Sequence, residues 1–129
     1  MEKDFKKWND KKNIINSITE IPNFHEREIW ICFLGLNIGF EQDGAGDNFQ
    51  RPVVIIKKFN NDTCLIIPLS TTNRRGRYYF AFIFESDVIS VAVLSQAKFI
   101  DARRLSFVIG YINEIDFSNL MKKFKALLP

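Results

Sequence analysis

The residues best suited to chemistry in this chain stand at the two ends of one apolar hairpin. Residues 52–59 and 63–68 are rich in β-branched and apolar side chains, a pattern that predicts two buried strands. The segment 60–62, Asn-Asn-Asp, is typical of a hairpin turn. Arg51 and Ser70 lie nine and eight residues from that turn, so an antiparallel register brings them to the same end of the sheet. A guanidinium beside a hydroxyl at a strand end predicts a phosphate site.

Further hydroxyl and basic groups follow Ser70 along the chain. Thr71 and Thr72 come next, so the predicted site has more than one source for its hydroxyl. The turn at residues 73–77 then carries three arginines, which are Arg74, Arg75 and Arg77. Two interpretations of these arginines stay open: contact with the phosphates of a nucleic acid, or a solvated basic loop.

Two aromatic residues directly follow the basic turn. Tyr78 and Tyr79 follow the basic turn, and the bases of single-stranded RNA commonly stack on such rings. Side chains alternate between the two faces of a strand, so one of these tyrosines is expected in the core.

His25 is the only histidine. It precedes the first predicted strand outside any motif, which favours a solvated position over a catalytic one.

A long polar loop, residues 37–50, leads into Arg51. It contains Glu41, Gln42 and Asp43 among several glycines. Its acidic residues lack the regular Asp spacing and the closing Glu of a calcium loop, so we expect no metal ion there. Loops of this length between strands more often close over a site or bind a ligand.

The composition indicates one cytoplasmic domain. The chain has 129 residues, of which 47% are hydrophobic, enough for a substantial core. Its formal net charge of +3 suits RNA or DNA as a partner but decides little. We expect no membrane association, because no apolar run approaches the ~20 residues of a membrane span and the first residues have no apolar signal region. Cys32 and Cys64 lie in apolar runs and are predicted to be buried, reduced thiols.

The pattern of the whole chain predicts a mainly β fold with helices, of the α+β class. Residues 3–20 are expected to form an amphipathic helix, and residues 113–128 a second helix with Asn113 as its N-cap. Between them, strands are expected at residues 28–36, 52–59, 63–68, 77–84, 88–94, 96–102 and 105–112. Many short strands followed by a helix predict a strongly curved sheet or a partly open barrel with the helix covering one side.

Several segments also occur in a recognisable order: REIWICFLGLNIGFEQ, QRPVVII, IIPLSTT, VAVLSQAKFIDARRL and a final IG before the last helix. In that order and spacing they resemble the MazF/PemK family, the toxins of type II toxin–antitoxin systems. The resemblance spans about residues 27–128 and implies an SH3-like small β-barrel with a C-terminal helix. It divides the chain into an N-terminal helical extension packed on the core, residues 1–26, and a barrel domain, residues 27–129.

The resemblance also implies a function. Family members are endoribonucleases that cut single-stranded mRNA at short sequences without a metal ion or other cofactor, which inhibits translation and growth. They act as homodimers, and a cognate antitoxin covers their RNA groove. Two other interpretations remain: a non-catalytic toxin on the same barrel that binds a topoisomerase, or an SH3-like module that binds peptide or nucleic acid.

The catalytic residues that the resemblance implies are those at the ends of the hairpin. Arg51 matches the family's catalytic arginine, and the family's catalytic threonine falls on Ser70. A serine at this position departs from the family pattern, and a one-residue shift would give the role to Thr71. Attack by the ribose 2′-hydroxyl would yield 2′,3′-cyclic phosphate and 5′-hydroxyl ends. We expect Arg51 to stabilise the phosphorane and to act as an acid-like donor, with the general-base role that the family assigns to this arginine as the alternative. The hydroxyls are expected to position the phosphate.

Some RNA-binding residues are implied by the resemblance, and others are predicted from their charge. Glu41 and Gln42 match the family's loop beside the RNA channel. Gln96 matches a glutamine of a later strand, where some members carry an acidic residue one position earlier and this chain has Ser95. The three arginines of residues 73–77 complete the predicted RNA-binding set on the basis of their charge.

Overall fold

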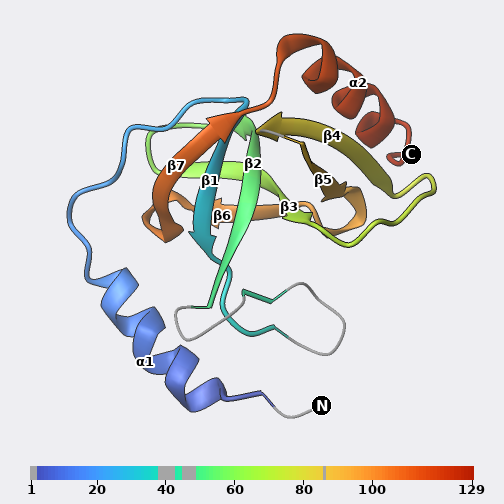
Figure 1. Ribbon diagram of the computed structural model, residues 1–129. Helices are drawn as coiled ribbons and strands as arrows, with labels where there is room; N and C mark the ends of the chain where they lie inside the picture. Colours follow the sequence, from blue (N-terminus) through green and yellow to red (C-terminus); the bar gives the residue numbers. More distant parts are fainter. Residues whose placement is uncertain (1–2, 38–42, 45–48, 86) are drawn as a thin grey trace.

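The computed structural model describes residues 3–37, 43–44, 49–85 and 87–129 of the chain. Seven strands and two helices make up most of this part, in agreement with the predicted α+β class (Figure 1). The elements are α1 (Phe5–Asn16), β1 (Glu28–Phe33), β2 (Gln50–Lys58), β3 (Thr63–Ser70), β4 (Tyr79–Glu85), β5 (Val88–Val93), η1 (Leu94–Gln96), β6 (Lys98–Asp101), η2 (Ala102–Arg104), β7 (Leu105–Tyr111) and α2 (Glu114–Lys125). The two η elements are single turns of 3-10 helix.

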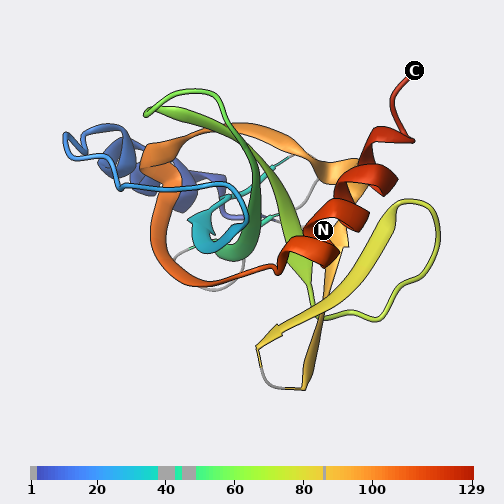
Figure 2. The same cartoon turned by 90° about the horizontal axis from the view of Figure 1, so that it is seen from above.

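The strands form one antiparallel sheet that bends strongly around β3. The strand order is β4-β5-β3-β2-β1-β7, and β6 also pairs with β3. The beginning of β3 pairs with β6, whereas its last two residues pair with β5. Because β3 changes neighbours along its length, the sheet wraps, and the β4–β5 hairpin projects away from the remaining strands (Figure 2). Among the described strands no ladder joins β7 to β4, so the sheet is a partly open barrel.

The hairpin of β2 and β3 is the central unit of this sheet. Its register pairs Val53 with Pro68 and Ile55 with Ile66. The turn is closed by Asn60, whose Oδ1 accepts hydrogen bonds from the amides of residues 62 and 63 at 2.8 and 2.9 Å. Both strands are longer than their sequence patterns predicted, and they include residues 50–51 and 69–70. The register therefore places the start of β2 beside the end of β3.

Side chains of β2 alternate between two apolar cores. Val53 and Ile55 belong to one buried cluster, and Val54 and Ile56 belong to the other. This two-sided burial explains why the strand appears in the sequence as a continuous apolar run. The first cluster also contains Cys32 and Cys64, which are free and fully buried, as predicted. Burial raises the pKa of both thiols to about 12, so they stay protonated at neutral pH.

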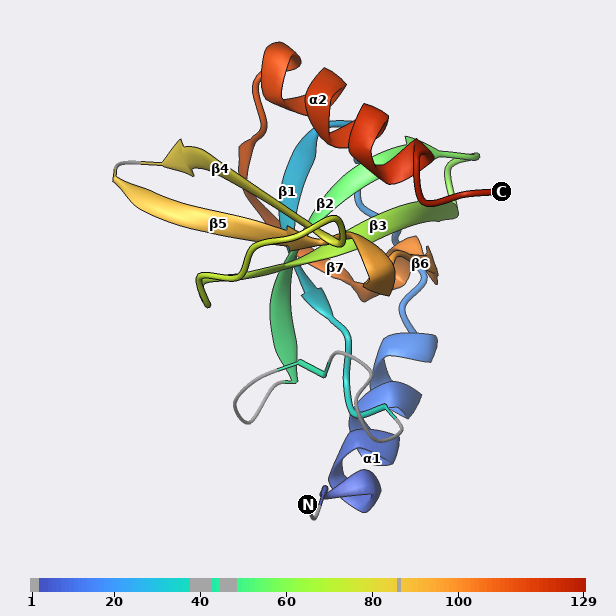
Figure 3. The same ribbon diagram turned by 90° about the vertical axis from the view of Figure 1, so that its right-hand side faces the viewer.

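The C-terminal helix α2 covers the second core and follows its prediction closely. The Asn113 side chain caps the helix by accepting a hydrogen bond from the Asp116 amide at 2.8 Å. Leu120 is fully buried, and it is flanked by the partly buried Phe117, Met121, Phe124 and Leu127. Burial of a leucine to this extent stabilises a fold by roughly 2–5 kcal/mol relative to alanine. Figure 3 shows α2 on the opposite side of the sheet from α1. Neither described helix is long and apolar enough to cross a membrane.

The N-terminal helix α1 is shorter than predicted. It ends at Asn16 rather than near residue 20, because Ser17 takes the C-cap position and its Oγ donates a hydrogen bond to the Ile14 carbonyl at 2.6 Å. Phe5, Trp8, Ile15 and Ile18 recur near helical spacing and were expected on its buried face, but of these four only Trp8 and Ile15 are buried. The other two, at positions 5 and 18, are 50% and 37% exposed. The buried pair packs with Phe33, Leu36 and Phe49.

Three further strands differ from their predicted bounds by two residues or more at one or both ends. The first strand ends at Phe33 instead of residue 36, since Gly35 adopts a φ of +74° that breaks the extended backbone. The strand expected at residues 77–84 starts at Tyr79. The strand expected at residues 96–102 is confined to Lys98–Asp101 and is flanked by η1 and η2. In η2, the carboxylate of Asp101 caps the turn by accepting from the Arg103 amide at 2.9 Å.

Candidate active site

Arg51 is the second residue of β2 and lies half-buried at the end of the hairpin. Its Nε donates to the Asp43 carbonyl oxygen at 2.7 Å, and its Nη1 donates to the Leu69 carbonyl oxygen at 3.3 Å. Burial lowers the pKa of Arg51, and the negative charge of Asp43 partly offsets this effect. An arginine in a protein nevertheless keeps its proton. The two carbonyls therefore hold a guanidinium that remains positively charged.

A cavity of about 210 Å³ opens beside this guanidinium. Ser70 and Thr72 supply hydroxyls to its wall, Arg74 supplies a second guanidinium, and Tyr79 supplies a phenol. Val91 and Val93 of β5 complete the lining. Their places follow from register, because β5 pairs Val91 with Ser70 and Val93 with Tyr79. The bend of the sheet at β3 thus brings four strands, β2 to β5, and the basic turn around one small, polar space.

Ser70 is the last residue of β3 and presents a fixed hydroxyl to the cavity. Its Oγ accepts a hydrogen bond from the Thr72 amide at 3.1 Å, a local turn typical of serine. That contact leaves the Ser70 hydroxyl proton able to donate to a ligand. Thr71, the alternative hydroxyl considered from the sequence, is exposed and is absent from the cavity lining. The geometry therefore groups Arg51 with Ser70.

The three arginines of the basic turn occupy different surroundings. Arg74 lines the cavity, with its Nη1 3.5 Å from the Tyr79 hydroxyl. The Arg77 guanidinium lies over the Tyr78 ring, 5.2 Å from its centroid. Arg75 is exposed. The sequence predicted one of the two tyrosines in the core, but neither belongs to it: the partly buried Tyr79 lines the cavity, and Tyr78 is 44% exposed.

Gln96 lies in a second cavity, of about 270 Å³, with Asn37, Pro68 and Lys98 among its lining residues. No residue lines both this cavity and the Arg51 cavity, but Asp43 contacts residues of both. Asp43, whose carbonyl holds Arg51, also accepts a hydrogen bond from the Asn37 amide through Oδ1 at 2.7 Å. The predicted RNA-binding residues Glu41 and Gln42 lie outside the described residues.

His25 is remote from this chemistry. Its side chain is exposed just before β1, and its Nδ1 lies 3.5 Å from the Glu28 carboxylate. It does not line the Arg51 cavity, in agreement with the solvated position that the sequence favoured. In the part of the chain that the structure describes, no three histidine, cysteine, aspartate or glutamate residues gather as potential metal ligands.

Sequence reasoning missed the main-chain partners of Arg51 and the valines of β5. The Asp43 and Leu69 carbonyls carry no side-chain signal, so no motif could have indicated them. Val91 and Val93 belong to an ordinary apolar run, and only the pairing of β5 with β3 brings them to the site. Thr72 was visible as part of the hydroxyl cluster, and the structure adds its amide as the group that fixes Ser70.

Two guanidiniums and several hydroxyl donors converge on a cavity too small for a folded partner and well matched to a phosphoryl group. Such an arrangement can bind the anionic phosphate of a nucleotide and stabilise extra negative charge on it. Among the residues that the structure describes, no imidazole and no carboxylate lines this cavity. The fold and site together define a small, partly open β-barrel with a basic, hydroxyl-lined cavity at the end of its central hairpin.

A family comparison agrees with this class. Residues 25–128 match the family described as PemK-like, MazF-like toxin of type II toxin–antitoxin system. The match covers far more than half of the chain, so the protein belongs to this family, as the sequence motifs predicted. The helix α1, which ends at Asn16, lies outside the matched residues. A comparison with curated protein sequences gave no match.

Solved structures share the fold at low sequence identity. MazF from Deinococcus radiodurans is 16% identical, with a TM-score of 0.65 over 84% of this chain and 97% of that chain. The Mycobacterium tuberculosis toxin MazF-mt6 is 19% identical, with a TM-score of 0.60 over 78% of this chain and 94% of that chain. A mycobacterial endoribonuclease in complex with its cognate antitoxin is 13% identical, with a TM-score of 0.61 over 83% and 98% of the respective chains.

Proposed function

We propose that this toxin is a metal-independent endoribonuclease that cleaves single-stranded mRNA in the cytoplasm and so stops translation and growth. The observation that carries the proposal is the common cavity of Arg51 and Ser70, to which Arg74 adds a second guanidinium. Family membership supports the same activity, since one structural relative is itself described as an endoribonuclease. Ser70 supplies the hydroxyl that the family's threonine would supply.

In this mechanism the scissile phosphate occupies the Arg51 cavity. The ribose 2′-oxygen attacks phosphorus, the bond to the 5′-oxygen breaks, and the products carry a 2′,3′-cyclic phosphate and a 5′-hydroxyl. Arg51 faces the developing negative charge with donors that match the phosphate oxygens. Its Nη2 has no hydrogen-bond partner within the described residues, so this group is well suited to meet a phosphate oxygen. The Ser70 hydroxyl donates to a second oxygen and fixes the orientation of the phosphate.

The proton of the 2′-hydroxyl passes to water in this account. Arginine stays protonated near neutral pH and is a poor general base, and no imidazole or carboxylate lines the described cavity. Activation of the nucleophile then depends on neutralising the phosphate charge, which Arg51 and Arg74 both do. Water returns a proton to the leaving 5′-oxygen, and the guanidinium of Arg51 donates a hydrogen bond that stabilises the charge on this oxygen.

The RNA strand on either side of the phosphate contacts the basic turn. Arg75 and Arg77 bind neighbouring phosphates, and the exposed Tyr78, beneath Arg77, offers a surface on which a base can stack. Gln96, in the adjacent cavity, contributes hydrogen bonds to a base. Glu41 and Gln42 belong to the same RNA-binding surface on the strength of the family resemblance.

A cognate antitoxin and a second copy of the chain are the proposed protein partners. Solved relatives include complexes described as MazE–MazF from Deinococcus radiodurans, which supports an antitoxin for this toxin. A homodimer is supported by the apolar side chains that are about half exposed on the β4–β5 hairpin and on β7. These residues are Ile83, Val88, Ile89, Phe107 and Val108.

The chemistry of the product ends tests the proposed function. The purified protein is incubated with a long single-stranded RNA in the presence of EDTA, and the new ends are analysed. We expect cleavage at a short recurring sequence, with 5′-hydroxyl ends that need a kinase before ligation and with 2′,3′-cyclic phosphate at the 3′ ends. Intact RNA under conditions where growth is inhibited would instead favour the non-catalytic toxin. Ends that carry a 5′-phosphate would exclude attack by the 2′-hydroxyl.

A further inference from the structure

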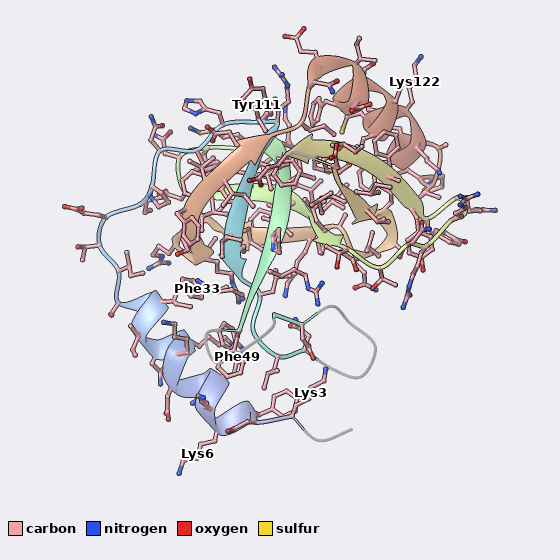
Figure 4. The ribbon with its side chains drawn as sticks, viewed as in Figure 1. Lys3, Lys6, Phe33, Phe49, Tyr111 and Lys122 are labelled. Atoms are coloured by element: carbon pink, nitrogen blue, oxygen red, sulfur yellow. The ribbon has the colours of Figure 1, made fainter. Side chains whose placement is uncertain are left out.

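The helix α1, which lies outside the family match, packs on the loop that leads into Arg51. The Trp8 indole covers Gly35 so closely that a Cβ at this position would overlap the ring. The same indole packs on the ring of Phe49, with 5.5 Å between centroids. Gly35 stands near the start of the loop, and Phe49 stands two residues before Arg51. One side chain of α1 therefore contacts both ends of this loop, and Figure 4 shows Phe49 facing the helix.

Lys3, just before α1, contacts the middle of the same loop. Its Nζ forms an ion pair with Asp43 Oδ2 at 2.7 Å and donates to the Asn37 carbonyl oxygen at 2.5 Å. The Lys3 side chain is only 6% exposed, and that of Asp43 is 24% exposed. Removing one partner of such a sheltered pair leaves the other charge poorly solvated. The contact is therefore a specific attachment, unlike an ion pair between two exposed side chains.

Asp43 joins this attachment to the catalytic arginine. Its side chain binds Lys3 through Oδ2 and the Asn37 amide through Oδ1. Its main-chain oxygen accepts the 2.7 Å hydrogen bond from Arg51 Nε. The other hydrogen bond of Arg51 in the described residues, to Leu69, is longer at 3.3 Å. A movement of Asp43 would thus release the shorter of the two contacts that orient the guanidinium.

We propose that the N-terminal segment positions the guanidinium of Arg51 for RNA cleavage, with Lys3 and Asp43 as positioning residues that act through the Asp43 carbonyl. The proposal rests on the endoribonuclease function argued above. Lys3 does not line the Arg51 cavity, so its effect reaches the phosphate only through the loop. Misplacement of a catalytic group by about 1 Å can reduce a rate about 100-fold. Loss of the contact between Lys3 and Asp43 is therefore expected to lower kcat.

The first test compares Lys3→Met with Lys6→Met in the full-length protein. Both variants remove one positive charge from the same segment, but Lys6 is exposed and points away from the loop (Figure 4). For Lys3→Met, we expect kcat on a short fluorogenic RNA to fall about tenfold or more, with KM changed less than about twofold. Lys3→Arg keeps the charge and is expected to recover most of the loss. A kcat for Lys3→Met equal to that of Lys6→Met would overturn the proposal.

A double-variant cycle tests whether Lys3 acts through Asp43. Asp43→Asn retains the main-chain carbonyl and a side-chain acceptor for the Asn37 amide but loses the charge that faces Lys3. The combination of Lys3→Met with Asp43→Asn should lower kcat no more than the stronger single variant, because the two residues form one contact. Independent, multiplying effects would show that Lys3 works by another route.

The position of the Arg51 side chain can be measured without any RNA. In a ¹⁵N correlation spectrum, the hydrogen-bonded Arg51 Nε–H should give a signal that exchanges slowly with water, assigned by its loss in Arg51→Lys. We expect Lys3→Met to accelerate that exchange at least about tenfold through opening of the contact, and Lys6→Met to leave it unchanged. If the protein cleaves no RNA, this measurement still decides the positioning. If it cleaves RNA and the exchange is the same in all variants, only the positioning inference fails.

Discussion

The Arg51 guanidinium is oriented by main-chain carbonyls, and this choice of partner matters for its chemistry. A carboxylate would hold the side chain equally firmly but would neutralise its charge, whereas the Asp43 and Leu69 carbonyls orient it and leave the charge for a ligand. Burial of Arg51 also favours binding of an anion, because a guanidinium that is poorly solvated gains more free energy from a bound phosphate. Ser70 is fixed in a comparable way by the Thr72 amide. Both groups are therefore preorganised for the proposed reaction.

This arrangement distinguishes the two hydroxyls that the sequence offered. Ser70→Ala is expected to lower kcat for RNA cleavage about 10- to 100-fold, because one oriented donor to the phosphate is lost. Ser70→Thr should stay within about fivefold of the wild type, since it restores the family's hydroxyl at the same position. Thr71→Ala should cost much less than Ser70→Ala. Single-turnover kinetics on a short RNA measures all three, and a larger loss for Thr71→Ala would reverse the assignment.

At the scale of elements, the site depends on contacts among the β2–β3 hairpin, the β5 strand and the added helix α1. The hairpin register could be predicted because its determinants are local: a turn closed by Asn60 and two flanking apolar runs. The N-cap Asn113 was predictable for the same reason. The contact of Trp8 with Gly35 joins segments far apart in the sequence, so it could not be predicted from local pattern. The exposed Phe5 also shows that helical spacing alone overestimates the buried face.

The C-terminal end of α1 is attached through η2 by an interaction that depends on pH. The Asp101 carboxylate accepts from Arg103 Nε at 2.9 Å and from Nη2 at 2.8 Å, while Arg103 Nη1 donates to the Asn16 carbonyl at 3.0 Å. The hydrogen bond from the Arg103 side chain is the main cause that lowers the pKa of Asp101. A carboxyl group with a lowered folded-state pKa stabilises the fold above its unfolded pKa, about 3.9, and loses this effect as the pH falls through the folded value.

Asp101→Asn is accordingly expected to lower the midpoint of urea unfolding at pH 7. The difference from the wild type should persist at about pH 5 and narrow at about pH 3, where the carboxylate of the wild type begins to protonate. Asp10→Asn removes an exposed charge from α1 itself and should leave the midpoint unchanged at every pH. A difference that is constant down to pH 3 would show that the Asp101 charge does not attach the helix.

At the scale of the whole molecule, the strongly curved sheet gives the site its shape. Because β3 pairs with β6 at one end and with β5 at the other, the end of the hairpin is enclosed by valines of β5 and by the turn that carries Arg74. Composition, strand pattern and motif order were sufficient to predict a small, partly open barrel with a terminal helix and the pairing of Arg51 with Ser70. They could not predict which arginine and which tyrosine of the following segment reach the cavity, because that depends on where β4 begins and how it pairs with β5.

Replacement of Arg51 tests the central claim most directly. Arg51→Lys keeps a positive charge but loses the planar fork of donors, and Arg51→Ala loses both. Cleavage of a single-stranded RNA is measured under single-turnover conditions, with thermal unfolding and RNA affinity measured on the same samples. We predict that Arg51→Lys loses at least about 100-fold in rate and Arg51→Ala more, while both variants stay folded and still bind RNA within about tenfold of the wild type. Cleavage by a folded Arg51→Ala protein at the wild-type rate would contradict the account.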